Sequence, residues 1–354
     1  MTSFDDADAD ADALPAPQAP VENRQDGGTR GGRTGEDTAP ATAPAVLLQR
    51  VSLLTWAGIG ALAALVGLLP WLATGLRLPL QNLWQAPTAP ADMPRVLLPF
   101  NQYAITLLLA VVVTGYATAG LFARVLGRVA GLRWPRRAML SLTAGVLGVH
   151  LLAAAQTAST VAAGLSARTA SALYLAALLA VLAFAVGTGL LVLRLVLAAS
   201  RPAVVIGVSL LAVIAASWLA ALITPFGAAP GQPGPLASAA SDAVLHWLPA
   251  VAVGAVIAWS GVHTLARLLA AAGGLALLWI LPAAFTALAS AASFRLLLPH
   301  PVELAEYGLQ VFQAALLMPE PALPPLLLAL VITTGGITAR HLLTRRPAGA
   351  RLRS

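Results

Sequence analysis

Cysteine and lysine are both absent from this 354-residue sequence. Without cysteine the chain forms no disulfide and offers neither a thiolate metal ligand nor a cysteine nucleophile. All 21 basic residues are arginine. Together with abundant alanine, glycine and proline, this choice is typical of a bacterium with a GC-rich genome, so the absence of lysine needs no functional explanation.

Acidic side chains are scarce beyond the first 37 residues. Nine of the fourteen precede Thr38, and five lie between hydrophobic runs: Asp92, Asp242, Glu303, Glu306 and Glu320. A charged group at the centre of a bilayer is costly, and acids that do occur there mark ion or proton pathways. We therefore expect no such pathway in this protein.

Most of the remaining chain is apolar. Hydrophobic residues make up 58% and charged residues 10% of the sequence, whereas a soluble domain has about 25% charged residues. Since one crossing needs about twenty apolar residues, we predict an all-α, polytopic transmembrane helix bundle of eight spans. The predicted spans are Val51–Thr74, Tyr103–Ala123, Ala138–Ala162, Ser171–Leu193, Val204–Thr224, Val244–Ala266, Ala270–Ala292 and Leu323–Ala339. The apolar run from Leu248 to Phe294 is too long for one helix, and we divide it near Arg267.

The arginines predict the orientation of these spans. With both termini in the cytoplasm, 17 arginines lie on the cytoplasmic side and four outside: Arg77, Arg95, Arg168 and Arg295. Short cytoplasmic loops of membrane proteins are rich in such residues.

We expect a protein of the cytoplasmic (plasma) membrane. Its expected partners are anionic lipids at its cytoplasmic face and other membrane proteins, and we expect it to bind no nucleic acid.

Composition divides the chain into three regions. Residues 1–46 are acidic, rich in proline and glycine and have almost nothing to bury, so we expect a disordered cytoplasmic tail. Residues 47–343 form the transmembrane helical domain. Residues 344–354 form a basic cytoplasmic C-terminal tail.

The third predicted span has a polar face. Thr143, His150 and Thr157 are spaced by seven residues, so they share one side of a helix, with His150 near its middle. One interpretation is a polar path for a solute around His150. The other is a neutral histidine hydrogen-bonded to a neighbouring helix, and the absence of an acid to pair with His150 favours this packing role.

The outer segment His300–Glu320 has the pattern of an amphipathic helix. Pro301 suits a first turn, and Pro319 and Pro321 are expected to end the helix. The predicted polar stripe is Glu303, Glu306, Gln310 and Gln313, and the predicted apolar stripe is Ala305, Leu309, Phe312 and Leu316. We expect an external helix along the membrane surface, serving as an interfacial anchor or as a lid over the bundle.

Recognisable catalytic motifs are absent. The sequence has no nucleophile turn, no zinc-binding helix motif and no phosphate-binding glycine loop. Its five histidines are scattered, so we expect no metal, no cofactor and no enzymatic activity. The lack of internal charge favours a membrane scaffold or assembly partner. The alternative is a permease for a neutral or amphipathic solute, with a small-polar path around His150.

Overall fold

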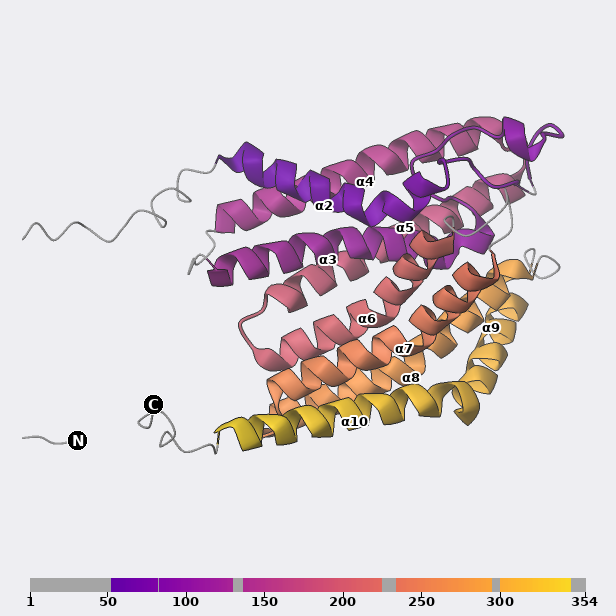
Figure 1. Ribbon diagram of the computed structural model, residues 1–354. Coiled ribbons are helices and arrows are strands. Elements are labelled where there is room, and N and C mark those ends of the chain that lie inside the picture. The colour runs from indigo at the N-terminus through magenta and orange to yellow at the C-terminus, as the bar shows by residue number, and fades with distance from the viewer. Residues whose placement is uncertain (1–51, 82, 130–135, 225–233, 295–299, 345–354) are drawn as a thin grey trace, which may run out of the picture. The chain divides into compact units, whose positions relative to one another are not determined.

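Long helices make up most of the structure (Figure 1). The computed structural model describes residues 52–81, 83–129, 136–224, 234–294 and 300–344. Its α-helices are α2 (Leu53–Ala73), α3 (Ile105–Val129), α4 (Arg136–Gly164), α5 (Thr169–Leu197), α6 (Arg201–Ile223), α7 (Pro235–Ser260), α8 (Leu265–Ser293), α9 (Pro301–Leu316) and α10 (Pro319–Thr344). Two short 3-10 helices, η1 (Pro90–Asp92) and η2 (Gln102–Ala104), lie between α2 and α3. Among the described residues, the only β-structure is two isolated bridges.

The predicted all-α fold is confirmed, and the lengths and composition of its helices fit a multi-pass membrane protein. In the described part of the chain, eight of the nine α-helices are long and apolar enough to cross a membrane, and each corresponds to one predicted span. The remaining helix, α9, has 16 residues. At 1.5 Å per residue it is about 24 Å long, shorter than the hydrocarbon core of a bilayer. Both predicted tails, apart from Thr344 at the end of α10, lie outside the described residues.

The turn between α7 and α8 comes earlier than the sequence indicated. α7 ends at Ser260 and α8 begins at Leu265, so Arg267, where we placed the turn, lies in the first turn of α8. Gly261 makes the turn with a φ of 71°, a left-handed conformation that favours glycine. Thr264 then caps α8, because its side chain accepts a hydrogen bond from the backbone N–H of Arg267.

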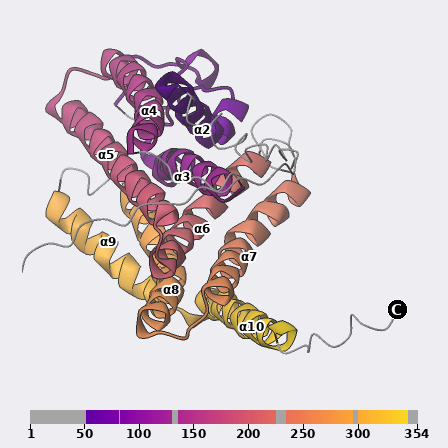
Figure 2. The same ribbon diagram turned by 90° about the vertical axis from the view of Figure 1, so that its left-hand side faces the viewer.

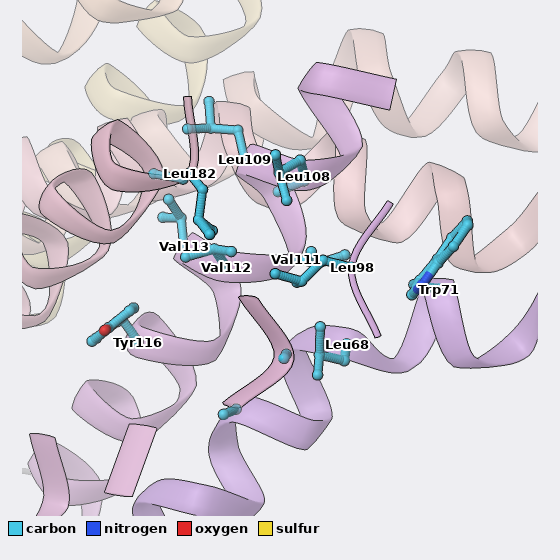
Figure 3. Packing of buried hydrophobic residues seen from close by; sticks show 14 of the residues in the cluster. Leu68, Trp71, Leu98, Leu108, Leu109, Val111, Val112, Val113, Tyr116 and Leu182 are labelled. Atoms are coloured by element: carbon cyan, nitrogen blue, oxygen red, sulfur yellow. The ribbon is translucent and has the colours of Figure 1, made fainter. Parts of the chain in front are cut away.

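Helices α3 and α6 lie in the middle of the bundle (Figure 2). α3 packs against α2, α5 and α6, and α2 also packs along α4. α6 packs against α7 and α8, while α10 lies on α7 and α9 on α8. The largest cluster of buried side chains contains residues of α2, α3, α4 and α5, of the loop before α3, and two residues of α6. In it, Leu98 lies close to Val111 (Figure 3). The clusters among α6, α7, α8 and α10 are much smaller, so this second half has the looser core.

Glycines let α2 approach two neighbouring helices closely. A Cβ at Gly145 of α4 would overlap the carbonyl oxygen of Ala57 in α2, and one at Gly60 would overlap the backbone of α4. A Cβ at Gly67 would likewise overlap the carbonyl oxygen of Val111 in α3. Because lipid tails are as apolar as the side chains, helices in a bilayer associate through such close van der Waals contacts.

The described residues of the loop between α2 and α3, 75–81 and 83–101, pack onto the bundle. Arg77 and Arg95 form an antiparallel bridge within it, and Leu78, Leu98 and Phe100 are buried. Backbone hydrogen bonds also join the loop to the residues around the end of α4. We call this segment the 75–101 loop.

Both described ends of the chain lie at one end of the bundle (Figure 1). We call it the arginine-rich end, because most described arginines lie there: Arg124, Arg128, Arg136, Arg137, Arg194, Arg201, Arg267 and Arg340. Arg77, Arg95 and Arg168 belong to the opposite end.

Arginines at the arginine-rich end also bind the carbonyl ends of helices. Arg267 donates to the carbonyl oxygen of Ser260 over 3.2 Å, and Arg340 donates to that of Trp259 over 2.8 Å. Cations are favourable at a helix C-terminus, where several carbonyls lack helical partners. These two arginines therefore help to hold α8 and α10 against the end of α7.

The close contact between α2 and α4 can be tested with two glycines of α4. We expect Gly145→Val to lower the free energy of unfolding by about 1–3 kcal/mol, because backbone atoms of α2 cannot yield to the added side chain. Gly148→Val is the control, since no atom lies within 4 Å of a Cβ there. Unfolding of both variants is measured in mixed micelles with increasing denaturing detergent. Equal losses of stability would contradict the close approach.

Candidate functional site

The three polar residues predicted to share one face of α4 have different environments. The Thr143 hydroxyl donates to the carbonyl oxygen of Met139 in its own helix, over 2.9 Å. His150 and Thr157 are almost completely buried, at 1% and 0% exposed. The structure therefore places all three on α4 without joining them in one accessible site.

Thr157 and its neighbour Gln156 bind the 75–101 loop. The Thr157 hydroxyl accepts a hydrogen bond from the backbone N–H of Leu98, over 3.0 Å. The Gln156 side chain accepts from the N–H of Leu97 over 3.0 Å and donates to the carbonyl of Arg95 over 3.2 Å. Irregular backbone within a membrane must find such partners in the protein, because lipid offers none.

His150 packs against α3. Its ring stacks on that of Tyr116, with centroids 5.4 Å apart and planes 11° apart, and a Cβ added at Gly115 would lie 3.1 Å from it. Its Nδ1 lies 3.0 Å from the carbonyl oxygen of Val146 in α4 itself. The expected hydrogen bond to a neighbouring helix is thus replaced by ring stacking. This burial favours the packing role of His150 over a solute path.

The role of Thr157 in holding the loop can be tested with two threonines of α4. Thr157→Val leaves the buried N–H of Leu98 without a partner, and we expect it to cost about 1–3 kcal/mol of stability. Thr143→Val is the control, because that hydroxyl serves only its own helix. Thermal unfolding of the purified proteins measures both. A loss at Thr143 as large as that at Thr157 would count against the role assigned to Thr157.

The segment predicted to be external forms a helix, α9, in which the four residues of the predicted polar stripe are exposed: Glu303, Glu306, Gln310 and Gln313. It starts at Pro301 as expected but ends at Leu316, and Pro319 begins α10 instead of ending α9. Figure 1 shows α9 turned steeply away from the direction of α10.

The apolar residues of α9 divide between two faces. On one, the Tyr307 ring stacks on Phe294 with centroids 4.7 Å apart, and the Leu316 carbonyl accepts a hydrogen bond from Trp279 of α8 over 2.9 Å. Ala305 and Leu309, predicted to line a single apolar stripe with Phe312 and Leu316, are exposed on another face, as is Val302. α9 thus has a polar face, a face against α8 and an exposed apolar face.

A cavity of about 500 Å³ lies between α6, α7, α8 and the junction of α9 with α10. Ligand pockets commonly measure roughly 300–1,000 Å³. Its apolar lining includes Val213, Leu278, Ala283, Phe285 and Met318. The cavity lies in the second half of the bundle, far along the chain from His150.

Asp242 and His246 supply polar groups to this cavity, together with Ser217. The two lie one turn apart on α7, and Asp242 is exposed and forms no ion pair with any described residue. The cavity therefore combines an apolar wall with a carboxylate and an imidazole.

Three helices that line the cavity contain proline there: Pro249 in α7, Pro282 in α8 and Pro325 in α10. A proline removes the helical hydrogen bond to the carbonyl four residues earlier. The residues whose carbonyls lose that bond, Leu245, Leu278 and Pro321, also line the cavity. Each of the three helices thus lacks a backbone hydrogen bond where it lines the cavity.

The sequence did not lead us to this cavity. We began the sixth span at Val244, which left Asp242 in a connection, whereas α7 begins at Pro235 and includes it. Pro235 was the available signal, because proline suits the first turn of a helix. The convergence of prolines from three helices has no signal in the sequence, since it depends on how these helices pack.

Comparisons with protein-family models, with curated proteins and with solved structures find no match to this chain. Its function is therefore argued from the geometry of its own residues.

Proposed function

We propose that this multi-pass membrane protein is a permease for an amphipathic solute, which it binds in the cavity between α6, α7, α8 and α10. The cavity itself is the observation that supports this function. We propose this cavity as the solute site in place of the path around His150, because the His150 side chain is almost completely buried. We propose no catalytic role.

The lining of the cavity indicates the class of solute. Its mainly apolar wall suits a hydrocarbon or aromatic body, while Asp242 and His246 suit a head group that is cationic or donates hydrogen bonds. Pro249, Pro282 and Pro325 provide positions at which the surrounding helices can bend to admit and release the solute.

The orientation proposed from the arginines places this cavity near the outer face. The arginine-rich end then lies in the cytoplasm, and α9 lies along the outer surface as an anchor, with Val302, Ala305 and Leu309 in contact with lipid. The same orientation places Asp242 near the outer boundary, where a carboxylate is far less costly than in the hydrocarbon core.

Single cysteines can test the orientation, because the chain has no native cysteine. A membrane-impermeant maleimide applied to intact cells should label Pro90→Cys and Gln310→Cys, and should label Arg137→Cys only after permeabilisation. Leu309→Cys is the matched control for Gln310→Cys: it is exposed in the structure but should be protected by lipid. Labelling of Arg137→Cys in intact cells would reject the orientation, and equal labelling at Leu309 and Gln310 would reject the anchor.

The cavity can be tested by filling it. We expect Ala322→Phe to weaken binding of a fluorescent long-chain quaternary ammonium by about tenfold, or about 1.4 kcal/mol, because the ring occupies the binding space. Ala339→Phe is the control, on the same helix but exposed and outside the cavity lining. Uptake of the same compound into proteoliposomes should follow the same order. Equal affinities and equal uptake for both variants would reject the cavity as the binding site.

A membrane scaffold is the second candidate, and the face of α4 that points away from the bundle favours it. This face carries small residues that are exposed: Ala144, Gly148, Ala155, Ser159 and Ala162. Small residues allow the close approach of another transmembrane helix. The partner we propose is a transmembrane helix of another membrane protein.

The scaffold predicts an assembly that depends on this face. Gly148→Leu should lower the mass of the complex extracted in mild detergent, because the larger side chain blocks close helix contact. Gly187→Leu is the control, since Gly187 of α5 is also open, with no atom within 4 Å of an added Cβ. A complex whose mass neither variant changes would argue against assembly through α4.

A further inference from the structure

Three arginines surround the indole ring of Trp259 at the arginine-rich end. The guanidinium carbons of Arg124, Arg128 and Arg201 lie 5.9, 5.5 and 5.5 Å from its ring centroid. They come from the end of α3 and the start of α6, and Trp259 comes from the end of α7. The cation–π attraction holds the side chains in place, but it leaves three like charges close together.

No carboxylate offsets these charges in the described part of the chain. The described acids, Asp92, Asp242, Glu303, Glu306 and Glu320, all belong to the opposite end of the bundle. Arg124 donates to the carbonyl oxygens of Val196 and Ala198 at the end of α5. Arg128 and Arg201 are exposed, and neither forms a hydrogen bond or ion pair with any described residue. Two guanidiniums thus keep their donors for a ligand.

The start of α6 adds to the positive potential. Arg201 is the first residue of α6, and the preceding Ser200 makes no side-chain hydrogen bond to cap the helix. The N-terminus of a helix carries a partial positive charge and favours anions. The three arginines and this helix end therefore attract the same kind of group.

Apolar side chains lie along α3 below the arginines. Leu121 and Val125 are seven and three residues before Arg128, so they share its face of the helix. Both are exposed, Leu121 at 41% and Val125 at 59%. A molecule that binds Arg128 through an anionic head can thus lay a hydrocarbon chain along α3 toward the middle of the membrane.

We propose that Arg124, Arg128, Arg201 and Trp259 form a binding site for the phosphate of an anionic phospholipid. The phosphate oxygens accept hydrogen bonds from Arg128 and Arg201, which can bind a phosphate bidentately. Arg124 contributes its charge, and an acyl chain contacts Leu121 and Val125. The exposed apolar face below the arginines favours a lipid over free phosphate.

Native mass spectrometry of the full chain can test this site. The protein is released from nanodiscs that contain phosphatidylcholine and phosphatidylglycerol in equal amounts, and the lipids it retains are counted. The wild type should retain phosphatidylglycerol in preference to phosphatidylcholine. Each arginine removed should weaken this binding about fivefold, so R128Q/R201Q should weaken it about 25-fold. The single variants R128Q and R201Q, each about fivefold weaker, serve if the double variant does not fold.

The control is R136Q/R137Q, which removes the same charge from exposed arginines at the same end of the bundle. It should retain phosphatidylglycerol like the wild type. An equal loss in the control would mean general attraction to a basic surface and would overturn the site, as would the absence of any preference for phosphatidylglycerol in the wild type.

Two further arms separate other anions from a lipid. Inorganic phosphate, added to the lipid-free protein in detergent, should stabilise it no more than chloride does, and a specific stabilisation that R128Q/R201Q abolishes would assign the site to free phosphate instead. Deletion of residues 1–44, which carry nine acidic residues, should leave lipid retention unchanged. If phosphatidylglycerol were retained only after that deletion, the acidic segment would occupy the arginine site in the full chain, and the lipid site would be overturned.

Discussion

The need to pair every backbone N–H and C=O without water governs this structure. Eight apolar helices satisfy most of these groups internally. The 75–101 loop is the exception, because its irregular backbone packs onto the bundle. Gln156 and Thr157 of α4 bind its N–H and C=O groups directly. Thr157, which the sequence placed on the polar face around His150, thus helps to hold a loop.

At the ends of helices, arginine side chains provide hydrogen-bond donors for backbone carbonyls that have no helical partner. Arg124 binds carbonyls at the end of α5, and Arg267 and Arg340 bind carbonyls at the end of α7. A long side chain can place its charge at the boundary of the membrane while its donors reach these carbonyls. The arginines from which we predicted the orientation therefore also join helices to one another.

The two halves of the bundle differ in how tightly they pack. Glycines bring α2 against α3 and α4, and one large cluster of buried side chains fills the first half. In the second half the clusters are small, and proline-containing helices surround a cavity. Weaker helices and unfilled space suit a region that binds a ligand and changes shape, whereas the dense half suits a rigid support.

The sequence by itself determined the class of protein and the number of helices that can span the membrane, because long apolar runs are a local property of the chain. It also located a helix over the segment from Pro301 to Leu316, through proline and amphipathic spacing. The sequence did not locate the turn at Gly261, because the run of hydrophobic residues continues through it. Only the tertiary structure decided that His150 stacks on Tyr116, that Asp242 lines a cavity and that three arginines meet at Trp259. Each of these depends on contacts between different helices, and such contacts follow from close packing, which leaves no periodic trace in the sequence.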